Sequence, residues 1–190
     1  MVHAARVACQ HPAVDLDLRL LAEDDAPAVQ AAVVESLDHL RPWMPWAQNE
    51  GTEDGRRAWI RQVSADADRH YGMWLDGRFV GGCGLHVRAG PGALEIGYWV
   101  HVDFTRRGIA TAAVRQLCAE AFRTHGIERV EIHHDRANVA SGRVAAAAGF
   151  VHVGERRRRP DAPGQEGVEL IWRLDRGRYA SAAFGAGAAT

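Results

Sequence analysis

The stretch "DFTRRGIATAAV", residues 103–114, decides the fold. An apolar run precedes it, and small and apolar residues at helical spacing follow, so it predicts a turn from a central strand into a helix. The first N–H groups of a helix have no acceptor within the helix, and with the helix dipole they attract anions. Gly108 lets a ligand approach the backbone, and Arg106 and Arg107 carry charge suited to phosphate oxygens. The stretch therefore predicts a site for a phosphate or pyrophosphate.

The common nucleotide-binding motifs do not occur in this stretch. It contains neither GxxxxGK(S/T) nor GxGxxG. A solvated turn is the competing interpretation, because the chain is rich in arginine: all 23 of its basic residues are Arg. The flanking sequence has to decide between a ligand-binding loop and a plain turn.

The sequence on both sides predicts a single α/β domain. Alternating or continuous apolar runs predict strands, and the Asp76-Gly77 pair predicts a two-residue hairpin turn. We expect strands at 14–21, 94–102, 128–135, 150–159 and 168–174, a hairpin at 71–87, and helices at 22–40, 52–70, 109–126 and 138–149. The domain boundaries that we expect are an N-terminal extension at 1–13, the domain at 14–175 and a flexible tail at 176–190, which is rich in Ala, Gly and Ser.

Composition excludes several classes of protein. The chain has 190 residues, of which 47% are hydrophobic, so it can bury a sizeable core. A net charge of -1 gives no general attraction to nucleic acid or to an anionic membrane. We see no apolar run of about 18 residues and no signal peptide, so we expect a cytoplasmic protein. The three cysteines are scattered and the adjacent His133 and His134 point to opposite strand faces, so we expect no metal.

Two longer stretches resemble a known family. "EIGYWVHVDFTRRGIATAAVRQLCAEAF" resembles the central strand, pyrophosphate loop and helix of the GNAT superfamily of acetyl-CoA-dependent N-acyltransferases, and "RANVASGRVAAAAGFVHVGERRR" resembles its later asparagine–serine helix. "LDHLRPWMPWAQ" is similar to the RimJ/RimL group of ribosomal-protein N-terminal acetyltransferases. The resemblance spans residues 15–174 and implies a mixed, mostly antiparallel sheet with splayed central strands, flanked by helices. Thr105 departs from the pattern, because the family usually has Gln or Arg there.

The resemblance implies a division of labour among the residues. Acetyl-CoA, or another acyl-CoA, would be the donor, and Val100 and Val102 would pair through their backbones with its pantetheine arm. The N–H groups that would hold the pyrophosphate are those of Arg107, Gly108, Ile109, Ala110 and Thr111. Asn138 would bind the pantetheine amides, or it merely caps its helix. The residues that would line the acceptor site, or cover it as a lid without contact, are Trp43, Met44 and Trp46.

Acyl transfer to an amine needs a proton acceptor and a donor to the leaving thiolate. We predict Glu95 as the base and Ser141 as the group that donates to the sulfur. Strand alternation places Glu95 and Tyr98 on opposite faces, so both cannot face one pocket unless a bulge intervenes, and of the two we choose Glu95. An α-amine has a pKa near 7.7–8.0, so deprotonation near pH 7 costs only about 1–1.5 kcal/mol. A weak base or a water chain therefore suffices for a peptide N-terminus.

Three functions remain open at this point. The first is acyl transfer to the α-amine of a protein or peptide, with no covalent enzyme intermediate. The second is transfer to a small-molecule amine such as an antibiotic or a polyamine, and the third is a sensor that binds acyl-CoA without turnover. The run "ERRRRP" is interpreted as a solvated strand edge rather than a nucleic-acid site. A homodimer is common among such enzymes, but the sequence itself does not reveal the oligomeric state.

Overall fold

The computed structural model describes residues 14–187, and side chains as far as residue 181. Its strands form one sheet in the order β1-β2-β3-β4-β5-β7-β6. Their bounds are Asp17–Leu20 (β1), Arg69–Leu75 (β2), Arg78–His86 (β3), Ala93–Val100 (β4), Arg129–Asp135 (β5), Val151–Arg157 (β6) and Val168–Asp175 (β7). Among these strands β4 and β5 alone pair in parallel, so the predicted mixed, mostly antiparallel sheet is confirmed.

The helices follow the predicted order along the chain. Their bounds are Ala26–Glu35 (α1), Leu37–Leu40 (α2), Glu53–Val63 (α3), Ile109–Arg123 (α4), Val139–Ala147 (α5) and Arg176–Gly187 (α6). The hydroxyl oxygen of Thr52 accepts from the N–H of Gly55 at 3.1 Å and thereby caps α3. Asp76 and Gly77 both have positive φ, 49° and 76°, which is the geometry that matches the right-handed twist of a two-residue hairpin.

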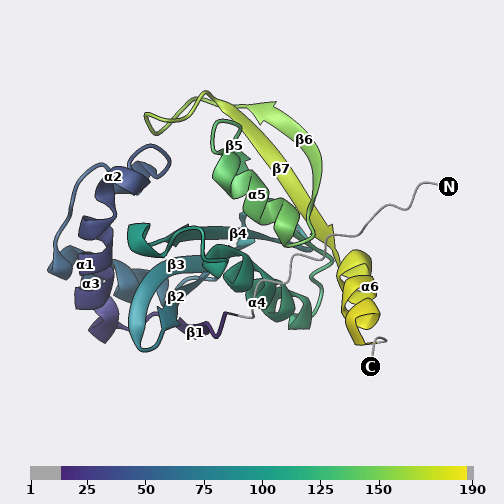
Figure 1. Ribbon diagram of the computed structural model, residues 1–190, viewed down its shortest axis with the longest axis horizontal. Coiled ribbons are helices and arrows are strands. Elements are labelled where there is room, and N and C mark those ends of the chain that lie inside the picture. The colour runs from purple at the N-terminus through teal and green to yellow at the C-terminus, as the bar shows by residue number, and fades with distance from the viewer. Residues whose placement is uncertain (1–13, 188–190) are drawn as a thin grey trace.

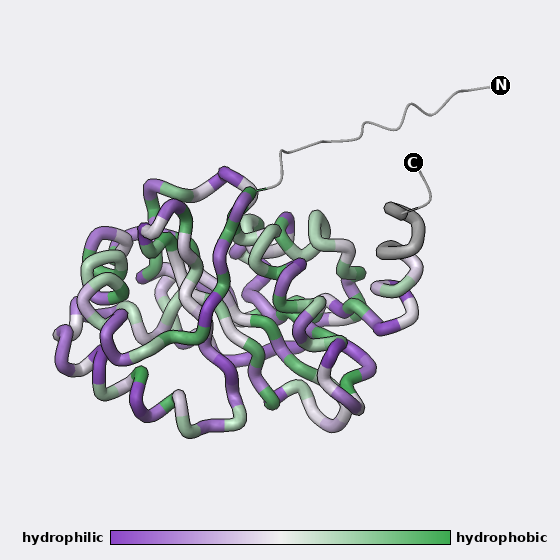
Figure 2. The backbone as a smooth tube through the Cα atoms, turned by 90° about the horizontal axis from the view of Figure 1, so that it is seen from below, coloured by the Kyte–Doolittle hydropathy of each residue, from purple (hydrophilic) through white to green (hydrophobic). Residues whose placement is uncertain are grey.

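The helices form a layer on each face of the sheet (Figure 1). Helices α4 and α5 cover one face, where Ile96, Val114 and Leu117 belong to the larger apolar core. Helices α1 and α3 pack at one end of the other face, where Val33 and Ile60 belong to a second core. In Figure 2 the outer loops are mostly hydrophilic, as expected for segments that bury little surface.

The sheet opens at its centre. Strands β4 and β5 pair only at Ala93–Arg129, Leu94–Val130 and Glu95–Glu131. Beyond these pairs β4 continues along β3, and β5 continues along β7. Figure 1 shows the two halves of the sheet diverging, β1–β4 below and β5–β7 above. This is the splay that the sequence resemblance implied, and it places backbone polar groups of both strands along an opening.

The C-terminal segment differs from the prediction of a flexible tail. Residues 176–187 form helix α6, at the end of the molecule opposite α1–α3 (Figure 1). The guanidinium of Arg176 donates to the carbonyls of Ile127 and Phe122 at 2.9 and 2.8 Å, and the Tyr179 ring lies 4.8 Å from that of Phe122. These contacts anchor an alanine-rich segment whose composition favours a helix. The expected extension at 1–13 and residues 188–190 lie outside the described residues.

None of the helices described is long and apolar enough to cross a membrane.

Candidate active site

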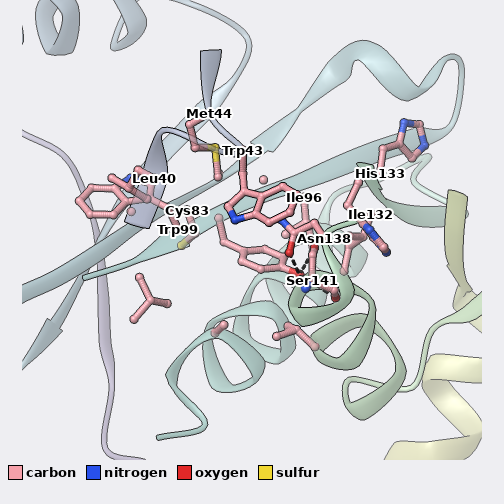
Figure 3. Close-up of a pocket in the computed structure, with 18 of the residues that line it drawn as sticks. Leu40, Trp43, Met44, Cys83, Ile96, Trp99, Ile132, His133, Asn138 and Ser141 are labelled. Carbon is pink, nitrogen blue, oxygen red and sulfur yellow. Dashed lines mark hydrogen bonds between the residues drawn. The ribbon is translucent and has the colours of Figure 1, made fainter. Parts of the chain in front are cut away.

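A cleft with a volume of about 1520 Å³ runs through the opening of the sheet. Both of its walls contribute residues: β4 with Glu95–Val100 on one side, β5 with Glu131–Asp135 and helix α5 on the other. Figure 3 shows Trp43 and Met44 reaching in from the loop before α3, with Asn138 and Ser141 on helix α5 opposite them. The cleft thus gives access to both faces of the sheet at the point where the strands part.

The turn before helix α4 has the geometry of an anion site. Gly108 caps the helix with φ 80°, and Arg106 adopts φ 61°, so both lie in the left-handed region. Within residues 14–187, the N–H groups from Arg107 to Thr111 donate to no acceptor. Five consecutive free donors at the start of a 15-residue helix are suited to the oxygens of a pyrophosphate.

The side chains of this turn differ in what they can contribute. The hydroxyl of Thr105 donates to the carbonyl of Val102 at 3.0 Å, so it closes the turn instead of replacing the Gln or Arg of the family pattern. The guanidinium of Arg107 lies over the Phe104 ring at 4.9 Å, whereas Arg106 lines the cleft. Arg106 is therefore the arginine placed to add charge near the ligand.

The backbone of β4 presents unpaired groups to the opening. The N–H of His101 donates to Val80 on β3, so by strand alternation the backbone groups of Tyr98 and Val100 point away from β3, toward the gap. Val102 is different, because its N–H donates to the Ser36 hydroxyl at 3.1 Å. Two residues, Val100 and Val102, were predicted to pair with the pantetheine arm. The backbone of Val100 is free to pair with an added strand, whereas that of Val102 is not. Tyr98 offers the second set of backbone groups that point into the gap.

A tyrosine and a serine meet across the opening. The Tyr98 hydroxyl lies 2.8 Å from Ser141 Oγ, and either oxygen can donate to the other. Asn138 Oδ1 accepts from the Ser141 N–H at 3.2 Å, so Asn138 caps α5 as the alternative interpretation held. Burial raises the pKa of Tyr98 to about 12, which keeps the phenol protonated at neutral pH. The sequence analysis placed Tyr98 on the face opposite Glu95, which is correct, yet both residues line the cleft because it passes through the sheet.

The face of the sheet opposite α4 is hollowed by glycines. Gly82, Gly84 and Gly97 lie side by side on β3 and β4, and all three line the cleft. A Cβ at Gly82 would come within 2.7 Å of the Trp99 indole nitrogen, so the missing side chains leave room for aromatic rings. The predicted acceptor residues Trp43, Met44 and Trp46 line this part of the cleft, and the Trp46 and Trp99 rings lie 5.9 Å apart.

Glu95 lies in a buried cluster of ion pairs on this same face. Its carboxylate accepts from Arg88 at 2.6 Å and lies 3.4 Å from His133 Nδ1. Glu131 and Glu169 lie beside the same imidazole, at 2.9 and 3.8 Å. Burial raises the pKa of Glu131 and Glu169, but other contacts outweigh burial and bring each pKa below its usual value. Glu131 accepts hydrogen bonds from His133, Arg129 and Arg173, and Glu169 accepts them from Arg158 and Arg156. The strand alternation is thus correct, and Glu95 lines the cleft with a strong cationic partner.

A histidine that the sequence analysis did not select also lies on this face. Asp68 Oδ2 lies 2.8 Å from His86 Nδ1, and Asp68 Oδ1 accepts from the Val87 N–H. Because a carboxylate only accepts, Nδ1 carries the proton of this contact, and Nε2 has no hydrogen-bond partner among the described residues. A Cβ at Gly97 would come within 3.1 Å of that Nε2, so the ring lies directly over β4. Sequence spacing gives no signal for this pair, which the pairing of β2 with β3 brings together.

Comparisons with known proteins agree with this geometry. Residues 15–151 match the family model described as the acetyltransferase (GNAT) domain. The chain is 30% identical to a Bacillus subtilis (strain 168) protein named "Putative ribosomal N-acetyltransferase YdaF". The aligned stretch is 148 residues long and covers 75% of this chain and 81% of that protein. The structure of Mycobacterium smegmatis RimJ in complex with CoA-disulfide matches with a TM-score of 0.80 at 26% identity, over 93% of this chain and 91% of that one.

RimL, a ribosomal L7/L12 alpha-N-protein acetyltransferase solved in complex with coenzyme A, matches with a TM-score of 0.77 at 21% identity, over 87% of this chain and 97% of that one. The protein therefore belongs to the GNAT family of acetyltransferases, as its sequence resemblance indicated. It is an N-acetyltransferase that uses acetyl-CoA as its co-substrate.

Proposed function

We propose that this enzyme acetylates the α-amine at the N-terminus of a peptide or protein. The observation that carries the proposal is the half of the cleft that is lined by glycines of β3 and β4 and by tryptophan rings. This half meets the Tyr98–Ser141 pair where the two strands separate. Relatives named for ribosomal N-acetylation support it. A polycationic small molecule fits this half poorly, because Glu95, Glu131 and Glu169 are each already paired with arginine.

The chain's own groups can hold the donor without any side-chain ligand to its phosphates. The free N–H groups from Arg107 to Thr111 would bind the pyrophosphate, and Arg106 would add charge. The backbone of Tyr98 and Val100 would pair with the pantetheine arm as with an added strand. Asn138 can bind the same arm through its amide N–H₂ while its Oδ1 caps α5. Acetyl-CoA bound in this way supplies a thioester at the opening.

The Tyr98–Ser141 pair is placed to protonate the leaving sulfur. In the reaction the amine nitrogen forms a bond to the thioester carbonyl carbon, the C–S bond breaks, and the thiolate takes one proton. Ser141 can give its hydroxyl proton and receive that of Tyr98, since the two oxygens are 2.8 Å apart. Because the amine attacks the thioester carbonyl directly, the reaction forms no covalent enzyme intermediate.

Two groups on the acceptor face can take the proton from the amine. Glu95 is the group predicted from the sequence, and it is tied to Arg88. His86 is held by Asp68 and has a free nitrogen over Gly97, one residue from Tyr98. The free lone pair favours His86 over the ion-paired Glu95 as the first proton acceptor, and Glu95 then keeps His133 and Arg88 in place.

The proposal is tested by thiol release from acetyl-CoA with a panel of amines. The panel holds short peptides with free and with acetyl-blocked N-termini, a peptide whose only free amine is a lysine side chain, polyamines and amino-sugar antibiotics. We expect release with free N-termini and none with blocked ones, and mass spectrometry should show one added acetyl group. Release with polyamines or amino sugars alone would overturn the peptide assignment. Calorimetric binding of CoA with no release from any amine would favour a sensor.

Two further properties belong to the proposal. We place the enzyme in the cytoplasm, where acetyl-CoA and nascent N-termini occur together, and we expect a homodimer. Light scattering coupled to gel filtration decides the second point, because a monomer of 20.8 kDa and its dimer differ twofold in mass.

A further inference from the structure

The guanidinium of Arg56 is an unmatched cation on the acceptor side of the cleft. Arg56 lies in α3 and lines the cleft, with its charge centre 5.7 Å from the Trp46 ring and 5.6 Å from the Trp59 ring. Its Nε is buried and has no hydrogen-bond partner among the described residues. Burial lowers the pKa of Arg56, and no carboxylate offsets this cost. A buried donor without an acceptor is unfavourable, which points to a partner supplied by a ligand.

The neighbouring arginines of α3 show the contrast. Arg57 donates to Glu53 at 3.0 Å, and Arg61 donates to Glu23 at 2.6 Å. Both lie outside the cleft, and their charges are balanced by the chain itself. Arg56 is held by aromatic rings alone, and such stacking fixes the plane of a guanidinium while leaving its N–H groups free to donate.

The remaining charges of the acceptor side agree with an anionic ligand. Three buried carboxylates, those of Glu95, Glu131 and Glu169, are bound by five guanidinium groups, those of Arg88, Arg129, Arg173, Arg156 and Arg158. Arg158 also donates to Asp161, which lines the cleft as well. None of these three glutamates is free to attract a cationic acceptor, whereas the guanidinium of Arg56 has no carboxylate partner among the described residues.

We propose that Arg56 binds a carboxylate carried by the acceptor near its reactive amine. This inference rests on the proposed function and narrows it to acceptors with an acidic group. Two distances indicate where that group lies. The charge centre of Arg56 is 5.7 Å from the Trp46 ring, and the Trp46 ring is 5.9 Å from that of Trp99, which lies beside Gly97. Two or three extended residues, at about 3.3–3.6 Å each, span such a path when the length of an acidic side chain is added to theirs. An Asp or Glu at the second or third position of a peptide fits, as does the free carboxylate of a small amine.

The first arm of the test is kinetic. Tetrapeptides that differ only in Asp, Asn or Lys at position two, and a second set varied at position three, are assayed by thiol release alongside a free dipeptide. We expect kcat/KM for an Asp peptide to exceed that of its Asn partner by on the order of tenfold or more, the range of a hydrogen-bonded charge pair. The variant Arg56→Gln should remove this preference and leave the Asn peptide within about threefold.

Control variants separate recognition from structure. Arg61→Gln removes a paired arginine outside the cleft and should keep the Asp preference. Arg56→Lys keeps the charge without the planar fork and should keep part of it. A merely structural role of Arg56 between its two tryptophans would lower turnover of Asp, Asn and Lys peptides equally, and that result would overturn the proposal.

The second arm measures binding without turnover. N-acetylated product peptides bearing Asp or Asn are titrated while tryptophan fluorescence is followed. Wild-type protein should bind the Asp product more tightly, and Arg56→Gln should bind both alike. Acetylation of peptides with no charge preference would refute the Arg56 proposal and leave the proposed function standing. An Arg56-dependent preference among small carboxylated amines, with no turnover of any peptide, would support the Arg56 proposal and refute the proposed function. No turnover of any peptide or carboxylated amine, and no binding of any product, would refute both.

Discussion

The hydroxyl oxygens of Tyr98 and Ser141 lie 2.8 Å apart, so a residue of strand β4 and a residue of helix α5 meet where the sheet opens. Ser141 is in turn fixed by its N–H, which donates to the Asn138 side chain that caps the helix. The contact is thus held by residues of the chain itself. It orients two neutral donors toward the same side of the cleft, which is the preorganisation that an acid catalyst requires.

Removal of either hydroxyl should slow the chemical step. We expect Tyr98→Phe and Ser141→Ala each to lower kcat by about 10- to 100-fold while the KM for acetyl-CoA changes little, because a positioned acid contributes about 10²–10⁴-fold. Because burial raises the pKa of Tyr98 to about 12, the wild-type rate should show no alkaline fall from this phenol up to about pH 10. Full turnover by both variants would show that the pair does not serve the leaving group.

The two candidate bases can be separated by isosteric variants. If His86 takes the proton, His86→Gln should lower kcat/KM by on the order of 100-fold and Asp68→Asn by about tenfold, since the carboxylate orients the ring. Glu95→Gln should then act mainly through stability, seen as a lower Tm with a smaller loss of rate. The opposite order of effects, with turnover lost in Glu95→Gln and kept in His86→Gln, would assign the base to Glu95.

A methyl group at Gly97 tests the position of the imidazole. The Cβ of Gly97→Ala would lie 3.1 Å from His86 Nε2, so the ring must shift by a few tenths of an ångström while Asp68 holds its other side. We expect kcat to fall on the order of threefold to tenfold. Gly154→Ala is the matched control, because it lies on a strand with nothing within 4 Å of the new methyl group. Equal rates in the two variants would argue against a catalytic role for this ring.

The fold should lose stability on mild acidification through His134. The Trp172 indole N–H donates to His134 Nε2 at 2.9 Å, and the Nδ1–H of the ring donates to the Asp135 carbonyl, so the folded state needs the neutral ring. Burial lowers the pKa of His134 in the folded protein. The unfolded chain, with a pKa near 6.5, then binds more protons below that pH, and this stabilisation is lost as the pH falls.

The measurement is the urea midpoint followed by tryptophan fluorescence at pH 7.5 and 5.5. It should be lower at pH 5.5, and His134→Gln should reduce the difference because an amide can keep both hydrogen bonds without titrating. Part of the pH effect should persist in the variant, since burial also lowers the pKa of His70 and His39. An unchanged difference would show that His134 does not contribute.

Local patterns in the sequence were sufficient for the elements and for the geometry of the turn before α4. The order of strands and helices, the Asp76-Gly77 turn, the Thr52 cap and the loop around Gly108 all depend on residues close together in the chain. The residues of the acceptor side, by contrast, are brought together by the pairing of strands. His86 meets Asp68 only because β2 pairs with β3, and Glu95 meets Glu131 only because β4 lies parallel to β5.

Two features of the structure depend on contacts between residues far apart in the chain. The segment after Asp175 resembles a linker in composition, yet Arg176 and Tyr179 attach it to the loop and helix around Phe122. The backbone of Val102 resembled a continuation of β4, yet Ser36, 66 residues earlier in the chain, takes its N–H. No local sequence pattern indicates that Phe122 or Ser36 would be the partner.

A sheet ordinarily has two edges, but the parting of β4 from β5 after Glu95 and Glu131 gives this one four. The inner margins carry unpaired N–H and C=O groups, as outer edge strands do, and such margins can recruit foreign strands. Natural sheets protect an edge with charge, proline or a covering helix, whereas in the binding mode proposed above the pantetheine arm of the co-substrate would pair with these margins. Bound in that way, acetyl-CoA would act as a removable eighth strand, and its absence would leave the inner margins open to pairing with other strands.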